Sequence, residues 1–251
     1  MKASIYKNRL VTISSILTLF LVWSMAAAVV GKEIILPSPL VTLTQLYHLL
    51  TSGGFWTHLG ATLSRGLLGF GLSFLAGLFF GLLSGLHSAF KSFFHLWLTV
   101  IRSTPSMALI LLALIWFESD AVTLFVTFLV VFPLITQNVT EGLAQIDPRL
   151  KEMARLYRVR FPTILYRMYL PAILPYLATA AAAGLGLTWK VMIAAEVLAY
   201  PRWGIGARMD TARTYLQTPE VFAWTIVVIT ISLFFDRILN ALIRKQLLYW
   251  E

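Results

Sequence analysis

The sequence of 251 residues contains no cysteine and few charged residues. The lack of cysteine excludes a disulfide framework, a cysteine-ligated zinc site and thiol chemistry. Asp, Glu, Lys and Arg together make up 12% of the chain, whereas typical soluble domains carry about 25%. Hydrophobic residues make up 59%. Charge this sparse over this length favours an integral membrane protein over one large soluble helical core.

Several catalytic and nucleotide-binding motifs are also missing from the sequence. It holds neither a G-x-x-x-x-G-K-[ST] phosphate loop nor an H-E-x-x-H metal motif, so the chain cannot bind ATP by that loop. The four histidines are scattered without the spacing of metal ligands; they are His48, His58, His87 and His95. An intramembrane enzyme is therefore disfavoured, and we expect no catalytic residue, no metal and no cofactor. Period-2 alternation is absent as well, which disfavours a membrane barrel.

Uncharged apolar runs predict an all-α, polytopic membrane protein that forms a single domain over 1–251. A helix needs roughly 20 apolar residues to cross the hydrocarbon layer. We expect six spans, at about 10–30, 66–86, 103–117, 121–140, 170–198 and 221–243. The first run is too long for the apolar core of a typical signal peptide, so we expect it to be retained, with cleavage as the alternative.

Lysine and arginine indicate the orientation of these spans, because they concentrate in cytoplasmic loops. If the N-terminus is cytoplasmic, that side holds Lys2, Lys7, Arg9, Lys91, the six basic residues of 149–167, Arg244 and Lys245. The other side holds Lys32, Arg202, Arg208 and Arg213. Four further cations fall within or at the ends of the expected spans and are not counted: Arg65, Arg102, Lys190 and Arg237. We therefore expect both termini in the cytoplasm. The net charge of +9 then reflects loops that face anionic lipid, rather than nucleic-acid binding.

The densest basic cluster falls in the cytoplasmic segment 143–169. Asp147 and Pro148 suit the cap and first turn of a helix, and we expect Pro162 to end or kink that helix. Its apolar side chains share one face; they are Leu150, Met153, Ala154, Tyr157 and Phe161. Such a helix binds lipid phosphates at the inner surface, or docks into a groove on a cytoplasmic partner.

This stretch resembles the E-A-A…G…I-x-L-P loop of permease subunits from bacterial ABC importers. Glu152-Met153-Ala154 stands for E-A-A, Arg158 falls at the G, Met168 stands for the I, and Leu170-Pro171 matches L-P. Four further segments are similar to the nitrate/sulfonate/taurine branch of that family, in the same order: LPSP at 36–39, TWKVMIAAEVL at 188–198, GIG at 204–206 and YLQTPEVFAWT at 215–225. The resemblance covers most of the chain.

The resemblance implies a homodimeric permease in the bacterial cytoplasmic (inner) membrane that carries a small solute. Its implied partners are cytoplasmic ABC ATPase subunits and an extracytoplasmic solute-binding protein. The 148–165 loop is then the coupling segment, and the coupling residues are Glu152, Met153, Ala154, Arg155, Tyr157, Arg158, Leu170 and Pro171. An ion-coupled secondary transporter that acts without an ATPase is the alternative.

Arg158 departs from the family pattern. Glycine adopts φ > 0 at little cost, whereas arginine is strained there. We therefore expect Arg158 to stay helical and the turn to shift toward Pro162.

Two ionisable residues, Lys190 and Glu196, lie late in the fifth expected span. Such groups usually face the protein interior or a water-filled cavity. Being six residues apart, they lie about 120° from each other around a helix and cannot pair side by side. We take both as candidates for the translocation path or its gate. The alternative is that Lys190 reaches the interface and Glu196 bonds a neighbouring loop.

Small residues form a stripe along the second expected span, at a spacing of four: Gly69, Ser73, Gly77, Gly81 and Gly85. This spacing places all five on one helix face, where a second backbone can approach closely. We expect packing within the same chain, and a dimer seam is the alternative.

Overall fold

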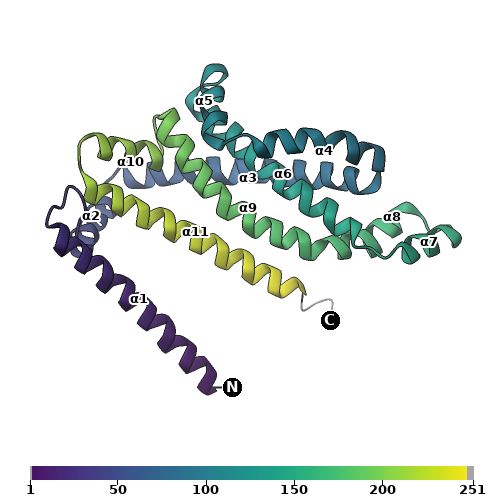
Figure 1. The fold of residues 1–251 in the computed structure, drawn as a ribbon, viewed down its shortest axis with the longest axis horizontal. Coiled ribbons are helices and arrows are strands. Elements are labelled where there is room, and N and C mark those ends of the chain that lie inside the picture. The colour runs from purple at the N-terminus through teal and green to yellow at the C-terminus, as the bar shows by residue number, and fades with distance from the viewer. Residues whose placement is uncertain (1, 248–251) are drawn as a thin grey trace.

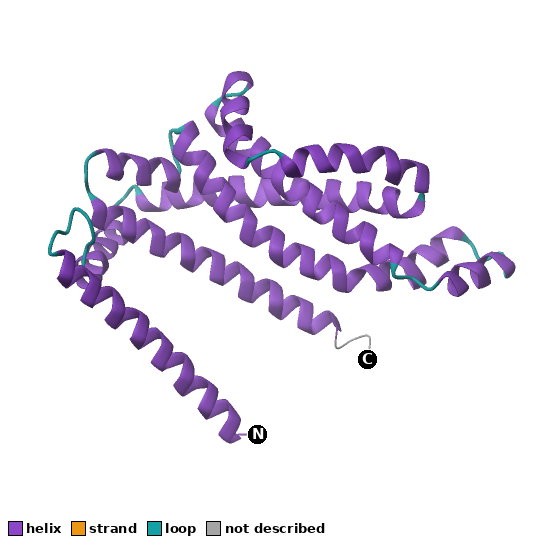
Figure 2. Cartoon of the chain, viewed as in Figure 1, coloured by secondary structure: helices purple, strands orange, loops and turns teal. Residues whose placement is uncertain are grey.

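Helices make up all the regular structure in the computed structural model, which describes residues 2–247 and the side chains of 11–239 and 241. The expected all-α class is confirmed for these residues, among which no strand occurs (Figure 2). Five of the cations counted for orientation, Lys2, Lys7, Arg9, Arg244 and Lys245, have side chains outside this described part.

The helices follow one another with short connections (Figure 1). Their bounds are α1 Lys2–Val30, α2 Pro39–Thr51, α3 Phe55–Leu86, α4 Ser88–Ser103, α5 Ser106–Trp116, α6 Ser119–Ala144, α7 Pro148–Leu156, α8 Phe161–Ile164, the π-helix η1 Leu165–Tyr169, α9 Leu170–Ala199, α10 Ile205–Thr214 and α11 Thr218–Leu247. In the described part, five stretches are long and apolar enough to cross a membrane: within α1, α3, α6, the continuous rod α8–η1–α9, and within α11.

The bent pair α4–α5 supplies a sixth candidate crossing and differs from the expected span at 103–117. α5 has 11 residues, so it is about 16 Å long and cannot cross a hydrocarbon layer of about 30 Å alone. α4 and α5 meet at an angle of 96°. Pro105 lies at the break, where it lacks an N–H and disfavours helical backbone at Thr104. We did not expect α4, because Lys91, His95 and Arg102 interrupt its apolar run.

The stripe of small residues on α3 packs against α6 within the same chain, as expected. A Cβ at Gly77 would lie 2.6 Å from Ile135 Cβ, at Gly81 2.6 Å from Val139 Cβ, and at Gly85 2.4 Å from Leu143 Cδ1. The partner is always 58 positions later in the sequence, so α3 and α6 run parallel and in register. Only glycine allows the two helices to approach this closely along such a length.

The two ends of the helix bundle carry different elements. α2 and α10 lie together at one end, and α7 and α8 lie at the opposite end (Figure 1). The free ends of α1 and α11 both point away from the end that holds α2 and α10. α2 begins at the LPSP segment, where Ser38 Oγ accepts a hydrogen bond from the Val41 N–H at 3.4 Å and Pro39 occupies the first turn.

Helix α7 begins as expected and ends differently. Asp147 caps it, because its carboxylate accepts the Arg149 N–H at 2.8 Å, and Pro148 follows in the first turn. Our expectation that Arg158 stays helical is wrong, since its φ is +48°. The Arg158 N–H donates to the Arg155 carbonyl and the Val159 N–H to the Ala154 carbonyl, each at 3.0 Å. These two bonds make a Schellman motif, with Arg158 in the position that favours glycine.

Pro162 begins a helix instead of ending one, contrary to our expectation. α7 already ends at Leu156, and Pro162 occupies the first turn of α8, where its missing N–H leaves no intrahelical bond unmade. η1 then continues directly into α9 at Leu170-Pro171. The basic segment is therefore a short helix, a left-handed turn and a second helix that continues into a long apolar crossing.

The α3–α6 contact yields a stability prediction with a matched control. Gly77→Val should destabilise the protein by about 1–3 kcal/mol, because its side chain must displace Ile135 in a close-packed contact. A Cβ at Gly71, also on α3, meets nothing within 4 Å, so Gly71→Val should leave stability nearly unchanged. Thermal unfolding of the purified variants in detergent compares the two, and equal melting temperatures would contradict the packing described.

The left-handed Arg158 yields a second prediction. Arg158→Gly should stabilise the turn after α7 by about 1 kcal/mol, because a left-handed backbone costs roughly that much for a residue with a Cβ. Amide hydrogen exchange over 148–160, followed by mass spectrometry, should slow severalfold in the variant. Arg160→Gly, two positions on and at φ −63°, is the control and should not slow exchange. Faster exchange in Arg158→Gly would contradict the strain at this position.

Candidate functional site

A fully buried carboxylate, Glu196 of α9, is the centre of a polar cluster between helices at the end that holds α2 and α10. Its side chain has no exposed surface. Thr62 Oγ1 donates to it with both carboxylate oxygens at 2.9 Å, and the Gly206 N–H donates to Oε2 at 2.9 Å. Arg65 Nη1 lies 2.6 Å from Oε1. A buried charge needs this kind of pairing and hydrogen bonding.

Thr62 and Arg65, the partners of Glu196 on α3, share one helix face with His58, at a spacing that repeats about once per helical turn. Arg65 also donates to the Trp203 carbonyl at 2.5 Å and lies 2.8 Å from the Asp120 carboxylate at the start of α6. Further along the loop, Thr62 Oγ1 accepts the Ile205 N–H at 2.9 Å, and His58 Nδ1 accepts the Gly204 N–H at 3.1 Å. α3 therefore holds α9, α6 and the α9–α10 loop together.

Two glycines of the GIG segment allow the loop to approach Glu196. A Cβ at Gly204 would lie 2.7 Å from Glu196 Cδ, and a Cβ at Gly206 would lie 2.6 Å from Glu196 Cβ. Neither glycine has the left-handed backbone that only glycine adopts easily, since φ of Gly204 is 170°. The requirement is for space, because any side chain here would displace the carboxylate. We call His58, Thr62, Arg65, Glu196 and the loop 203–206 the outer cluster.

Sequence analysis proposed Glu196 but missed Arg65. Arg65 is the only charged residue of α3, and we placed it at the end of a span, whereas it lies inside a helix that begins at Phe55. A lone charge within an apolar helix requires a partner, and this signal was available in the sequence. Lys190, the other candidate, is exposed on α9 and makes no ion pair or hydrogen bond within the described residues. It therefore lies outside the outer cluster.

The candidate coupling residues lie together at the opposite end of the molecule, on α7 and at the start of α9. Ala154 is buried, whereas Met153 is 50% and Tyr157 77% exposed. Glu152, Arg155 and Arg158 are exposed, and no ion pair or side-chain hydrogen bond involves them in the described part of the chain. Leu170 is 40% exposed and Pro171 half-buried at the first turn of α9.

One side-chain hydrogen bond and one buried side chain connect α7 to the bundle. Lys151 Nζ donates to the Leu143 carbonyl in the last turn of α6 at 3.3 Å, and Ala154 packs inward. Most of its other charged and apolar side chains face outward. Among residues 11–239 and 241, no group of three or more His, Asp or Glu side chains is placed to hold a metal ion.

Comparison with known proteins identifies the family of this chain. The family model for the inner membrane component of binding-protein-dependent transport systems matches residues 73–247. A probable ABC transporter permease protein of Brucella abortus is 31% identical over 219 residues, which is 87% of this chain and 87% of the relative. The taurine transport system permease protein of Escherichia coli is 26% identical, over 93% of this chain and 86% of the relative.

A third relative is the bicarbonate transport system permease protein of Synechococcus elongatus, 27% identical over 91% of this chain and 86% of that protein. The resemblance carried by the loop motif is thus confirmed over most of the chain. The chain belongs to the family of binding-protein-dependent transport system inner membrane components, and within an ABC transporter it is the multi-pass permease subunit, the non-catalytic membrane component.

Proposed function

We propose that two copies of this chain form the translocation path, with both termini in the cytoplasm and α7 docked in a groove on each ATPase subunit. The observation that carries this proposal is the outward face of α7, where Arg155, Tyr157 and Arg158 are exposed and make no side-chain hydrogen bond or ion pair within the described residues. A surface that mixes exposed Met, Tyr and Arg is typical of a protein interface.

The external binding protein delivers the solute at the opposite end, where α2 and α10 lie (Figure 1). Charged side chains of α10 are available there, with Arg208 paired to Glu220 at 3.0 Å and Arg213 to Asp210 at 2.8 Å. The relatives named for taurine and for bicarbonate favour a small polar solute. Lys190, exposed on α9, stays a candidate for contact with that solute.

The outer cluster acts as a gate in this proposal. Glu196 joins α3, α9 and the α9–α10 loop through one buried carboxylate, so its bonds must break or move together if these elements separate. Removing one partner of a buried pair is costly, because the other charge is left without compensation. The closed arrangement is thus favoured until ATP-driven closure of the ATPases moves the helices. We assign Glu196 a structural and gating role rather than direct contact with solute.

Reversal of one α7 charge tests the docking proposal. Arg155→Glu should reduce co-purification with the ATPase, and ATP-driven uptake, by at least about tenfold, as expected when a charge at an interface meets the wrong sign. Arg202→Glu makes the same change on an exposed residue at the other end of the molecule and should leave co-purification unchanged. Uptake driven by an ion gradient through the chain alone would contradict the proposal.

Neutralisation of Glu196 tests the gate. Glu196→Gln should cost about 3 kcal/mol of stability, because Arg65 stays buried without its main partner. It should also impair uptake and the coupling of ATPase activity to solute. The control is Asp210→Asn, which removes the more exposed pair with Arg213, a pair worth about 0–1 kcal/mol. Thermal unfolding and ATPase assays are the measurements, and wild-type values of both for Glu196→Gln would refute the gating role.

A further inference from the structure

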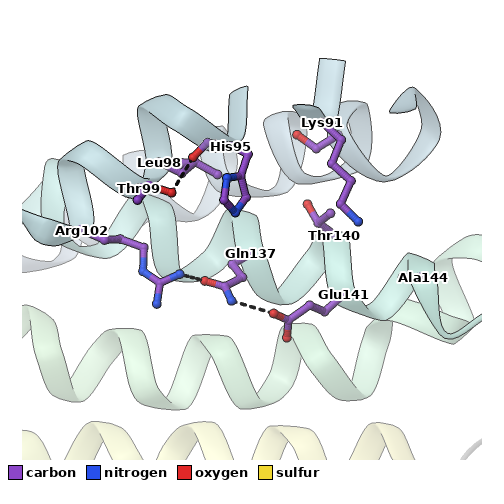
Figure 3. Close-up of a pocket in the computed structure, with 10 residues that line it drawn as sticks. Lys91, His95, Leu98, Thr99, Arg102, Gln137, Thr140, Glu141 and Ala144 are labelled. Carbon is purple, nitrogen blue, oxygen red and sulfur yellow. Dashed lines mark hydrogen bonds between the residues drawn. The ribbon is translucent and has the colours of Figure 1, made fainter. Parts of the chain in front are cut away.

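Helix α4 turns a basic face toward α6 and an apolar face outward (Figure 3). Lys91, His95 and Arg102 fall within about 40° of one another around the helix. On the opposite face, four large apolar side chains are 56–67% exposed: Phe93, Leu96, Trp97 and Val100. In a soluble protein, an amphipathic helix instead turns its apolar face toward the interior and its charged face toward solvent. The charges of α4 are thereby kept away from lipid, as ionisable groups at membrane depth are when they line an aqueous cavity.

The basic face of α4 borders a cleft of about 250 Å³ between α3, α4 and α6, which we call the inner cleft. Its polar walls are Lys91, His95 and Arg102 from α4 and Gln137, Thr140 and Glu141 from α6. A cleft of this volume admits several water molecules. The cleft is therefore large enough for a small solute.

Several polar groups of the inner cleft have no partner within the described residues. Arg102 donates to Gln137 Oε1, and Gln137 Nε2 donates to Glu141 Oε1 at 2.7 Å (Figure 3). In contrast, Lys91 Nζ and the His95 ring make no hydrogen bond or ion pair, and the buried Ser84 Oγ is also unpartnered. With two permanent cations against one carboxylate, the cleft has an excess of positive charge and free donors, which is suited to an anion.

A second cavity, of about 410 Å³, extends the inner cleft along α6 toward the break between α4 and α5. Arg102 lines both cavities, and Thr104, Pro105 and Ser106 of the break line the second. Non-helical backbone at membrane depth is tolerated where it is buried in protein or lines a water-filled cavity. The two cavities border α6 from Leu129 to Ala144, a rise of about 22 Å along the helix.

We propose that the inner cleft and its extension form the inner part of the translocation path, and that Lys91, His95 and Arg102 bind the oxyanion group of the solute there. This inference rests on the proposed function as a permease and adds a site on this chain's own residues at which a small oxyanion binds. Because the cations are spaced along one helix face, an anion that moves from Arg102 to Lys91 stays close to a positive charge throughout. Glu141, bonded through Gln137 to Arg102, limits how tightly the anion is held.

The absence of cysteine allows a direct test on the whole chain. Thr99→Cys places a single thiol on the wall of the inner cleft, in protein reconstituted in phosphatidylcholine vesicles. Two methanethiosulfonate reagents label it, one with an ethylsulfonate and one with an ethyltrimethylammonium head group. The ratio of their rates, divided by the ratio for free 2-mercaptoethanol, should favour the sulfonate by about tenfold, because a cationic cleft concentrates anions. Excess methanesulfonate should slow the labelling.

Charge-neutral variants make the test specific. In the Thr99→Cys background, Lys91→Gln with Arg102→Gln should return the ratio to that of the free thiol. Lys91→Gln alone should lower it partway, and it removes no hydrogen bond of the fold. Lys32→Gln with Arg202→Gln removes the same charge near the outer end and should leave the ratio high. A ratio near that of the free thiol in the parent, or no change in the Lys91 and Arg102 variants, overturns the proposal.

A lipid headgroup is the competing source of an oxyanion. If phosphatidylglycerol in the vesicles slows labelling and methanesulfonate does not, the inner cleft is a lipid site and the proposal fails. Because the test needs no ATPase, its outcome is independent of docking at α7. If the chain supports ATP-driven uptake but shows no preference for the anionic reagent, this inference is refuted and the proposed function stands. If the preference is present but α7 does not dock on the ATPase, the proposed function is refuted and the anion site stands.

Discussion

The close parallel contact between α3 and α6 fixes the position of both candidate sites. Glycine on α3 meets a large side chain of α6 at 77, 81 and 85, always with the same offset, so the two helices cannot slide without clashing. α3 carries Thr62 and Arg65 at its beginning, and α6 leads directly into α7 at its end. We propose that a displacement of α7 is transmitted along this pair toward Glu196.

The two ends of that pair have opposite electrostatic character. At the outer cluster, the buried carboxylate is satisfied by a cation, a hydroxyl and a backbone N–H, so the structure there is self-sufficient. At α7, Arg155 and Arg158 are exposed, and neither they nor Lys91 in the inner cleft have a side-chain partner among the described residues. Unsatisfied polar groups mark where a protein has something further to bind. We propose that the outer cluster stabilises a closed arrangement, and that the ATPase and the solute bind at α7 and in the inner cleft.

The sequence predicted what depends on local pattern. The uncharged apolar runs predicted the long apolar helices. Asp147-Pro148 predicted the start of α7, because a helix cap acts within one turn. Arg65 and Glu196 are 131 positions apart in the sequence, so no local sequence pattern identifies them as a pair. We did not expect α4 because charged residues that interrupt an apolar run usually indicate a loop. That these residues form one face of a helix directed at α6 becomes clear only once the position of α6 is known. Arg158 was misjudged because two backbone hydrogen bonds outweigh the cost of its left-handed conformation.

The rigidity of the α3–α6 pair during transport is the claim on which this account depends. It is tested by the distance between spin labels on Leu75 of α3 and Asn138 of α6, a position that lines neither cavity, measured by pulsed electron resonance in the complex with its ATPase, with and without ATP. The account predicts one unchanged distance distribution while ATP is hydrolysed and solute is taken up. A shift of about 5 Å, one turn of helix, would show that the two helices slide and would contradict transmission from α7 to Glu196.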